Sequence, residues 1–313
     1  MLKKILITGG AGNIGGSLAR RLVRSNNYKV TIVDNLLTGS VTKLPDDNDH
    51  NWKFIKADVN EYRDIAPIML SESFDFVFHY AAVVGVRRTL ENPVMVLKDI
   101  HGLENIMSLS KNTGVERVFF SSSSEIYGEP YTLPQQESTT PLNSRLPYAI
   151  VKNVAEAFCK SYNLEFGLDY TIFRFFNTYG PLQSKDFVIS RFIEKAINNQ
   201  DIAIHGDGSQ TRTFCYIEDN LDATISALEN KHWINDVVNI GSDIEISILE
   251  LAKLVVRILK SNSQIVFLPR RNEGDMSRRK PDISKMRLFV SNDLKTLEEG
   301  IYLTAKQMGY VLP

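Results

Sequence analysis

The segment PYAIVK contains a tyrosine and a lysine, Tyr148 and Lys152, spaced four residues apart. On a helix, residues at i and i+4 lie on one face, so the lysine ammonium would lie beside the phenol. A neighbouring positive charge stabilises the phenolate and lowers the pKa of the tyrosine. Tyr148 could then serve as a base near neutral pH. The same spacing, taken alone, is also typical of a solvated helix face.

The segment TGGAGNIGG places Gly9, Gly12 and Gly15 between a predicted strand and a predicted helix. Such glycines permit a tight turn, a close approach of the backbone to a pyrophosphate, and packing of the helix on the strand. Asp34 ends the next strand, where a carboxylate accepts hydrogen bonds from an adenosine ribose and repels a 2′-phosphate. The pattern predicts an NAD site, and the nicotinamide charge would lower the pKa of Tyr148 further. The alternative is an ordinary glycine turn with an exposed aspartate.

A third polar segment, FFSSSSEIYG at residues 119–128, follows an apolar run directly. A run of serines is usually a loop, and on its own the segment predicts nothing more. The serine-ended strand and the glycine turn both precede PYAIVK. Together they make a chance occurrence of the tyrosine–lysine spacing improbable.

Strands and helices alternate along the first part of the chain. We expect strands at KKILIT, KVTIVD, WKFIKAD, FDFVFHYAA, VERVFFSS and LDYTIFRFFN, and helices at NIGGSLARRLVRS, ENIMSLSKN and YAIVKNVAEAFCKSYNLEF. This alternation predicts an α/β fold, a Rossmann-type doubly wound parallel sheet with helices on both faces. From about residue 180 the pattern becomes irregular, which predicts a smaller mixed α/β C-terminal lobe. We therefore divide the chain into 1–179, with a return segment near 214–241, and 180–313.

The composition is that of a globular protein, because 43% of the 313 residues are hydrophobic, 23% are charged and the net charge is −1. We therefore expect neither nucleic acid nor a membrane as a partner. Cys159 and Cys215 are the only cysteines, which favours a reducing compartment, the cytoplasm. Neither the cysteines nor the five histidines have the spacing of a metal site, so none is predicted.

The chain resembles the extended short-chain dehydrogenase/reductases that act on nucleotide sugars, a group of NAD-dependent epimerases, dehydratases and decarboxylases. The resemblance covers nearly all of the chain and rests on Asp34 and on the segments TGGAGNIG, KADV, HYAA, SSSSEIYG, YAIVK, RFFNTYGP, GDGSQTRTFCYIEDN and RRKPDIS. These segments in this order are specific to the family and much less specific to one reaction. The resemblance implies NAD as cofactor and a nucleotide-sugar substrate bound by the 180–313 lobe. It also implies a homodimer formed by the helix around 101–112 and the Tyr148 helix.

The resemblance implies roles for individual residues as well. For NAD they are Gly9, Gly12, Asn13, Ile14, Gly15, Asp34, Asn35, Asp58, Val59, Ala81, Ala82, Tyr148 and Lys152. For the chemistry they are Ser123, Glu125, Tyr148 and Lys152, with Ser123 bonded to the sugar hydroxyl that is oxidised. For the nucleotide sugar they are Ser124, Asn177, Arg212, Asp275 and Arg279. The chain departs from the family at Asp99, where many relatives carry asparagine.

The family shares a first step, in which the tyrosine removes the C4 hydroxyl proton and NAD takes the C4 hydride to leave a 4-keto sugar. We favour 4-epimerisation of a UDP-sugar, because the segment VVGVRRTLENP resembles UDP-sugar 4-epimerases. The alternative is UDP-glucuronate decarboxylation, because Ser124-Glu125 and Arg279 resemble decarboxylases. A 4,6-dehydratase is less favoured, since no aspartate stands beside Glu125, and so is a non-catalytic dinucleotide-binding protein, since Tyr148 and Lys152 are both present.

Plainer interpretations of two residues stay open. Glu125 could be a strand-end acid that accepts a backbone hydrogen bond, and Arg279 could be a surface arginine in a basic cluster.

Overall fold

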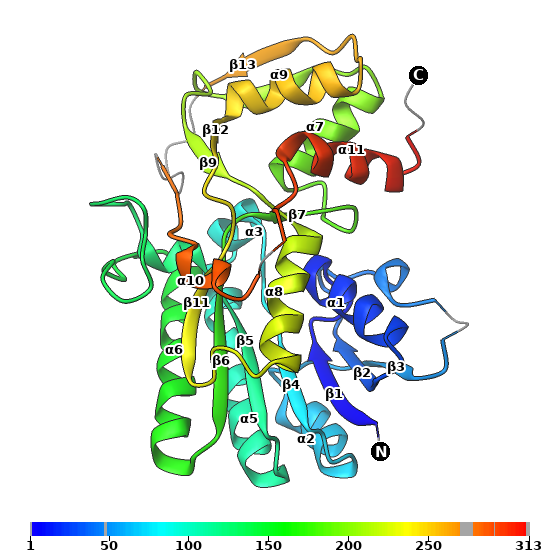
Figure 1. Cartoon of the computed structure of the whole chain (residues 1–313), viewed down its shortest axis with the longest axis vertical. Helices are drawn as coiled ribbons and strands as arrows, with labels where there is room; N and C mark the ends of the chain where they lie inside the picture. Colours follow the sequence, from blue (N-terminus) through cyan, green and yellow to red (C-terminus); the bar gives the residue numbers. More distant parts are fainter. Residues whose placement is uncertain (1, 47–48, 270–277, 291, 311–313) are drawn as a thin grey trace.

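A seven-stranded parallel sheet forms the centre of the computed structural model (Figure 1). The structure describes residues 2–46, 49–269, 278–290 and 292–310. The strands are β1 (Lys3–Thr8), β2 (Tyr28–Asp34), β3 (Trp52–Lys56), β4 (Phe76–His79), β5 (Arg117–Ser123), β6 (Asp169–Phe175) and β11 (Asp236–Ile240). Their order is β11-β6-β5-β4-β1-β2-β3, and every neighbouring pair is parallel. The predicted fold class is confirmed.

Helices cover both faces of the sheet. Successive side chains of a strand point to opposite faces, and both faces carry apolar side chains that the helices bury. Ile5 and Ile7 of β1 pack with Leu18 of α1 (Asn13–Arg24) and Leu221 of α8 (Ile217–Glu229). On the other face, Leu6 lies in the apolar cluster of α2 (Tyr62–Ser71), α5 (Asp99–Thr113) and α6 (Pro147–Phe166). Each fully buried aliphatic side chain contributes roughly 1.5–3 kcal/mol to stability. The two clusters therefore fix the sheet from both sides.

The strand order reverses between β1 and β4, which lie side by side at the centre of the sheet. From β1 the chain proceeds outward to β2 and β3, and from β4 it proceeds the other way to β5 and β6. The two connecting loops therefore diverge at the carboxyl ends of β1 and β4. In parallel α/β sheets this is the point at which a ligand crevice opens.

A smaller lobe lies beyond the carboxyl ends of the strands (Figure 1). Its helices are α7 (Val188–Ile197), α9 (Ile248–Ile258) and α11 (Leu297–Gln307). Its two-stranded sheets pair β7 (Thr178–Tyr179) with β10 (Cys215–Tyr216), β8 (Ile202–His205) with β13 (Ile265–Leu268), and β9 (Thr211–Thr213) with β12 (Glu245–Ser247). Short helical segments complete the fold: η1 (Val41–Lys43), α3 (Val86–Glu91), α4 (Pro93–Leu97), η2 (Ser124–Tyr127) and α10 (Ser284–Arg287).

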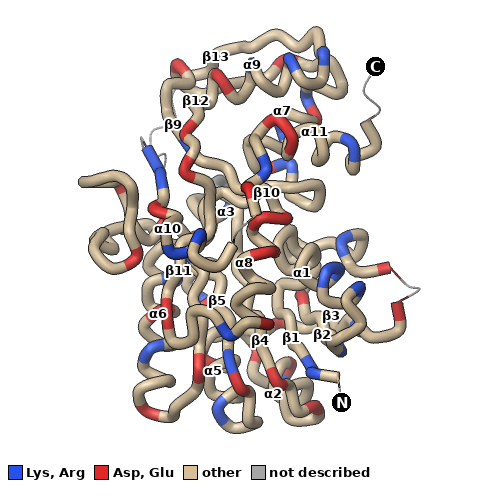
Figure 2. The backbone as a smooth tube through the Cα atoms, viewed as in Figure 1, with Lys and Arg blue, Asp and Glu red and all other residues tan. Residues whose placement is uncertain are grey.

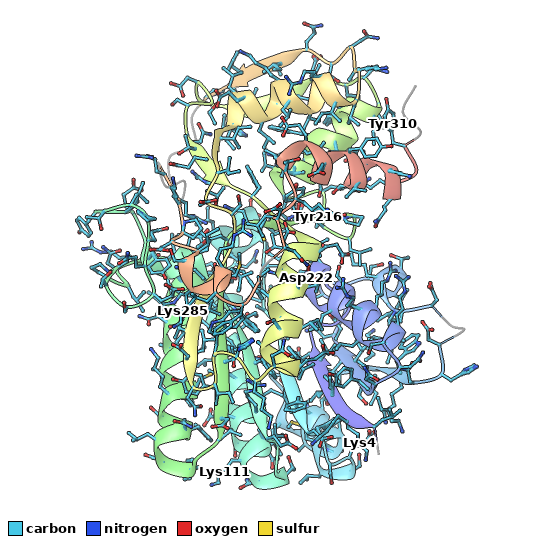
Figure 3. All side chains as sticks on the ribbon, viewed as in Figure 1. Lys4, Lys111, Tyr216, Asp222, Lys285 and Tyr310 are labelled. Carbon is cyan, nitrogen blue, oxygen red and sulfur yellow. The ribbon has the colours of Figure 1, made fainter. Side chains whose placement is uncertain are left out.

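Local contacts determine where the lobe helices begin and how they are held. Ser247 starts α9 and Thr296 starts α11, each through a capping box with a glutamate three residues later. Near the end of the described chain, the Tyr310 hydroxyl donates a hydrogen bond to the Leu259 carbonyl at 2.7 Å (Figure 3). Tyr216 lies where the lobe meets α8 and packs edge-on against Tyr179 (Figure 3).

Basic and acidic residues are interspersed along the chain in the view of Figure 2. Several lie in ion pairs between elements, such as Arg21 of α1 with Glu218 and Asp222 of α8. Among the residues that the structure describes, no helix is both long and apolar enough to cross a bilayer.

Candidate active site

A cavity of about 780 Å³ opens between the carboxyl ends of the strands and the lobe. It collects most of the predicted site residues: Gly9, Gly12, Asn13, Ile14, Gly15, Asp34, Asn35, Asp58, Val59, Ala81, Ala82, Ser123, Ser124, Glu125, Tyr148, Lys152, Asn177 and Arg279. Residues far apart in sequence thus line one space. Its size is within the ordinary range for small-molecule sites, roughly 300–1,000 Å³.

One end of the cavity is made mainly by backbone. Gly9 has a φ of +68°, and a Cβ there would lie 2.6 Å from the Ala81 nitrogen. A Cβ on Gly15 would lie 2.4 Å from the Gly9 carbonyl oxygen. Only glycine fits these two positions, which keep β1, the loop after β4 and the start of α1 in contact. The turn therefore brings the N-terminus of α1 to the floor of the cavity.

The same end fits the phosphates of a dinucleotide. Helix α1 begins after Gly12 without a side-chain cap, so its first N–H groups are available to an anion. The Asn13 Oδ1 atom is buried there, and no described residue bonds it. The Asp34 carboxylate lies nearby at the end of β2, where it accepts hydrogen bonds from the Ala11 and Leu36 nitrogens at 3.0 and 2.8 Å. A fixed negative charge at this point suits a ribose and opposes a 2′-phosphate.

Tyr148 and Lys152 meet at the other end of the cavity. Both lie on the first turns of α6, and the Lys152 ammonium is 5.8 Å from the centre of the Tyr148 ring. The ammonium donates a hydrogen bond to the Ser121 carbonyl at 2.6 Å, which ties α6 to the end of β5. Burial lowers the pKa of Lys152 to about 8. Their predicted placement on one helix face is found in the structure.

The prediction that Lys152 lowers the pKa of Tyr148 is wrong when only the protein's own groups are considered. Burial raises the pKa of Tyr148, and the Glu125 carboxylate raises it further. The Ser123 hydroxyl and the Arg279 guanidinium lower the pKa, but they do not reverse the effect of burial. The Lys152 ammonium is directed to a carbonyl instead of to the phenol oxygen. A lowered pKa therefore needs a further positive charge, such as an oxidised nicotinamide.

An ion pair between a buried arginine and a partly buried glutamate lies beside Tyr148. Strand β5 ends at Ser123, whose hydroxyl accepts a hydrogen bond from the Glu125 nitrogen at 3.2 Å and so starts η2. The turn brings Glu125 to Arg279, with Oε1 and Nη2 3.0 Å apart. Arg279 Nη1 also donates to the Ser124 hydroxyl at 3.4 Å, and its side chain is only 7% exposed. Glu125 is therefore an acid paired with arginine, and Arg279 is not a surface residue.

A second ion pair supports this turn from below. The Arg174 guanidinium on β6 holds both carboxylate oxygens of Glu156 on α6, at 2.9 and 2.7 Å. Glu156 also accepts a hydrogen bond from the Ser122 hydroxyl at 2.6 Å. Arg174 Nη1 donates to the Tyr127 hydroxyl at the end of η2. All four serines of the run line the cavity, and Ser122 in addition bonds Glu156 of α6.

One predicted substrate residue, Arg212, is not brought to this cavity. Arg212 lies buried on β9, where its Nη1 donates to the Thr211 carbonyl, and it is not among the cavity-lining residues. Asp275 lies outside the described residues. By contrast, Asn177 does line the cavity, with its side-chain nitrogen bonded to the Thr213 carbonyl at 2.9 Å. The roles of all three in binding substrate stay predictions.

Asp99, the departure from the family pattern, occupies a definite place. Its carboxylate accepts hydrogen bonds from the Val83 nitrogen at 2.7 Å and the Asn60 side chain at 3.4 Å. Burial raises its pKa, while the Lys152 ammonium lowers it. Asp99 therefore holds the loop after β4 at the cavity edge.

Sequence analysis missed several residues that line the cavity. These are Lys43, Tyr80, Arg88, Thr89, Lys98, Phe187 and Phe214 among others. Arg88 and Thr89 stand in VVGVRRTLENP, Tyr80 in HYAA and Phe214 in GDGSQTRTFCYIEDN, segments whose resemblance to the family did not assign roles to these residues. Lys43, Lys98 and Phe187 stand in no such segment. Within the described ranges, no cluster of three or more histidine, cysteine, aspartate or glutamate side chains is placed to hold a metal ion.

Comparison with known proteins agrees with this geometry. The family model of the NAD dependent epimerase/dehydratase family matches residues 5–241. The chain is 36% identical to a putative UDP-glucose 4-epimerase of Methanocaldococcus jannaschii, over 95% of each chain. It is 37% identical to the UDP-N-acetyl-alpha-D-glucosaminuronate decarboxylase of Bacillus cytotoxicus, over 92% of this chain and 91% of the relative.

A solved structure agrees as well. The UDP-glucose 4-epimerase of Thermotoga maritima, determined with UDP-glucose, superposes with a TM-score of 0.91 at 31% identity and covers 98% of both chains. The chain therefore belongs to the NAD-dependent epimerase/dehydratase family and is an NAD-dependent enzyme of the epimerase or decarboxylase kind.

Proposed function

We propose that this enzyme decarboxylates a UDP-linked uronic acid through a 4-keto intermediate. The observation that carries the proposal is Arg279, a buried guanidinium that lines the cavity and contacts Ser124 and Glu125. Arginine binds carboxylates through two parallel hydrogen bonds, and burial strengthens such contacts. A neutral hexose offers this guanidinium no charge to bind. A relative named as a decarboxylase of a UDP-linked uronic acid is 37% identical over 92% of the chain.

The chain's own residues suit the steps of such a reaction. We assign to Tyr148, which lies next to Ser123, the removal of the proton from the sugar C4 hydroxyl. Bound NAD would supply the oxidation at C4 and later the matching reduction. Lys152, held by the Ser121 carbonyl, keeps a positive charge near the phenol. The residues therefore provide a base, its supporting cation and a strand-end hydroxyl at one point.

Loss of carbon dioxide then needs little further help. In a 4-keto sugar with a C6 carboxylate, the C5–C6 bond breaks and its electron pair moves into the C4 carbonyl as an enolate. A proton subsequently adds at C5. Arg279 would hold the C6 carboxylate in place, and the Ser124 hydroxyl beside it would complete the contact. Glu125 Oε2 is buried and has no partner among the described residues, so it can accept a hydrogen bond from a sugar hydroxyl.

A second candidate is 4-epimerisation, in which the 4-keto sugar turns over before the hydride returns. It is supported by the epimerase relative at 36% identity and by the epimerase structure with a TM-score of 0.91. The α3 segment, which forms part of the cavity wall, has the sequence pattern that favoured this reaction.

Product analysis separates the two candidates. The purified protein with NAD is incubated with UDP-glucuronic acid, UDP-N-acetylglucosaminuronic acid, UDP-glucose or UDP-N-acetylglucosamine, and products are followed by NMR and mass spectrometry. We expect loss of carbon dioxide from a uronate. A product of unchanged mass with an inverted C4 configuration would instead establish epimerisation.

We also propose that the enzyme is a cytoplasmic homodimer that pairs through α5 and α6. Exposed apolar residues on α6 support the interface: Ile150, Leu164 and Phe166 are 44%, 87% and 47% exposed. Cys159 and Cys215 are both buried and free, which suits a reducing compartment. Light scattering of the purified protein tests the dimer, and a Leu164→Glu variant should shift it toward monomer.

A further inference from the structure

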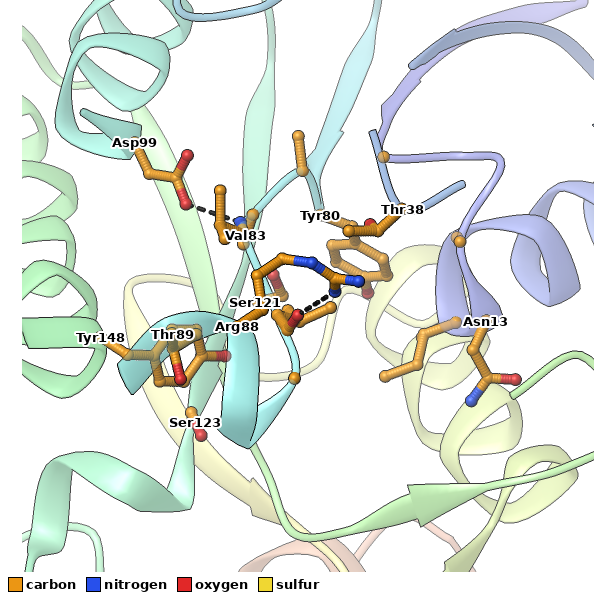
Figure 4. A pocket seen from close by; sticks show the side chains of 18 of the residues that line it. Asn13, Thr38, Tyr80, Val83, Arg88, Thr89, Asp99, Ser121, Ser123 and Tyr148 are labelled. Atoms are coloured by element: carbon orange, nitrogen blue, oxygen red, sulfur yellow. Dashed lines mark hydrogen bonds between the residues drawn. The ribbon is translucent and has the colours of Figure 1, made fainter. Parts of the chain in front are cut away.

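Arg88 reaches from α3 into the middle of the cavity. Figure 4 shows its guanidinium beside Tyr80, with Tyr148 on one side and the start of α1 at Asn13 on the other. The adenosine end of the cavity is marked by Asp34, and the reacting end by Tyr148. A diphosphate that joins two nucleoside or sugar groups must pass through the space between these ends. Arg88 therefore stands where a diphosphate is expected.

The Arg88 guanidinium has little to hold it in this position. Among the described residues it has two partners: the Val84 carbonyl, at 2.8 Å from Nη1, and the Asp186 carboxylate, at 3.6 Å from Nη2. The second distance is too long for a hydrogen bond, and the Asp186 side chain is 60% exposed. A guanidinium has five N–H donors. Most of its donors therefore remain for a ligand.

The backbone is shaped to let Arg88 fold into the cavity. Gly85 precedes α3 with a φ of +104°, a conformation that side chains rarely allow. A Cβ at Gly85 would lie 3.3 Å from Arg88 Nη1. The glycine thus allows both the turn into α3 and the return of the guanidinium toward the Val84 carbonyl.

Asp186 lies on the other side of the cavity, in the segment between β7 and α7. The long Arg88–Asp186 pair therefore joins the sheet side of the molecule to the lobe. We propose that Arg88 exchanges this loose contact with Asp186 for the diphosphate of a bound nucleotide. The fork of a guanidinium matches two phosphate oxygens, and a diphosphate carries two negative charges where a carboxylate carries one.

Two ligands could supply the diphosphate: the dinucleotide cofactor and the nucleotide-sugar substrate. The inference rests on nucleotide binding by the family and does not depend on which sugar reaction the enzyme performs. It can fail or succeed without the proposed function, because binding is measured without turnover.

The test compares the wild-type protein with Arg88→Met and Asp186→Asn, after removal of co-purified nucleotide. Calorimetric titration with NAD⁺, and with UDP at saturating NAD⁺, gives one dissociation constant for each diphosphate. Thermal unfolding verifies that each variant is folded. We expect Arg88→Met to raise the dissociation constant of one of the two ligands by about tenfold or more, because charge-assisted hydrogen bonds are lost. The ligand that weakens identifies the source of the diphosphate.

Asp186→Asn provides the matched control, because the two explanations predict opposite signs. If Asp186 competes with the diphosphate for Arg88, its neutral variant binds the ligand as tightly as wild type or more tightly. If Arg88 acts only by joining the two sides of the cavity, Asp186→Asn weakens binding as Arg88→Met does, and the proposal is overturned. Unchanged dissociation constants for both NAD⁺ and UDP in a folded Arg88→Met protein would overturn the proposal too. This holds even if the KM of that variant for a UDP-linked uronic acid rises.

Discussion

The two ends of the cavity are built from different materials. The dinucleotide end is made of backbone: two glycines in close contact, an uncapped helix start and one fixed carboxylate. The sugar end is made of buried charges, with Lys152, Glu125 and Arg279 each held by a neighbouring polar group. Backbone contacts suit a cofactor that all members of a family share. We propose that the charged side chains at the sugar end select the reaction.

The largest expected effect is at the sugar end, on Tyr148. Replacing it with phenylalanine removes the base without removing the ring that lines the cavity. We expect kcat to fall by about 10²–10⁴-fold, the usual contribution of a positioned acid or base, with the amount of bound NAD unchanged. Steady-state kinetics and nucleotide content measure the two quantities. A variant that keeps a tenth of the activity would show that another group is the base.

The support beneath the sugar end should be nearly as sensitive. Arg174→Met leaves the Glu156 carboxylate buried without its cation. Breaking a buried pair from one side costs about 3–5 kcal/mol of unfolding free energy. Urea unfolding measures this loss, and the Arg174→Met, Glu156→Leu double variant should regain part of it. Equal losses in the single and double variants would contradict the account of a paired charge.

A smaller effect is expected at the backbone end. Gly9→Ala places a Cβ 2.6 Å from the Ala81 nitrogen, in addition to an unfavourable φ of +68°. We expect a loss of stability of about 1–3 kcal/mol and weaker binding of NAD. Gly114→Ala is the matched control, since Gly114 has a φ of +77° and nothing within 4 Å of its Cβ position. If both variants lose the same stability and both keep NAD, the close contact at Gly9 has no importance.

The smallest effect is on pH dependence. Burial lowers the pKa of Lys152 to about 8, so its ammonium is progressively lost as the pH rises through that value. We expect kcat to decline above about pH 8. The folded-state pKa is below that of an exposed lysine, so burial of the ammonium opposes folding below pH 8, and this penalty is relieved at higher pH. A pH–rate profile that stays flat to pH 10 would contradict the assigned role of the ammonium.

The backbone end was predictable from sequence because its requirements are local. Gly9, Gly12 and Gly15 stand in one turn, and the strand before and the helix after them follow ordinary apolar patterns. The same is true of Tyr148 and Lys152, which share one helix. The sheet was predictable because β1, β2, β4, β5 and β6 are short, largely buried runs.

The sugar end was less predictable because its contacts are distant in sequence. Glu125 and Arg279 form an ion pair across nearly half of the chain, and nothing local to either residue specifies the other. The prediction of a lowered pKa for Tyr148 was wrong for a related reason, since burial by many residues outweighs the charge of one neighbouring lysine. Arg88 was missed because its role depends on a glycine turn and a distant aspartate. Helix α2 was also missed. It contains Pro67 in its interior, and a proline in a sequence is usually taken to mark the end of a helix.

The most direct test of the central claim compares two adjacent arginines. Arg279 is buried at the sugar end, whereas Arg278 is 54% exposed and paired with Glu245. Arg279→Met, Arg278→Met and the wild-type protein are each incubated with NAD and a UDP-linked uronic acid labelled with ¹³C at C6, and release of labelled carbon dioxide is followed by NMR. The account predicts release by the wild type and by Arg278→Met, and a loss of at least about tenfold in Arg279→Met. Equal release by Arg279→Met, or no release by the wild type while a neutral UDP-sugar is epimerised, would contradict it.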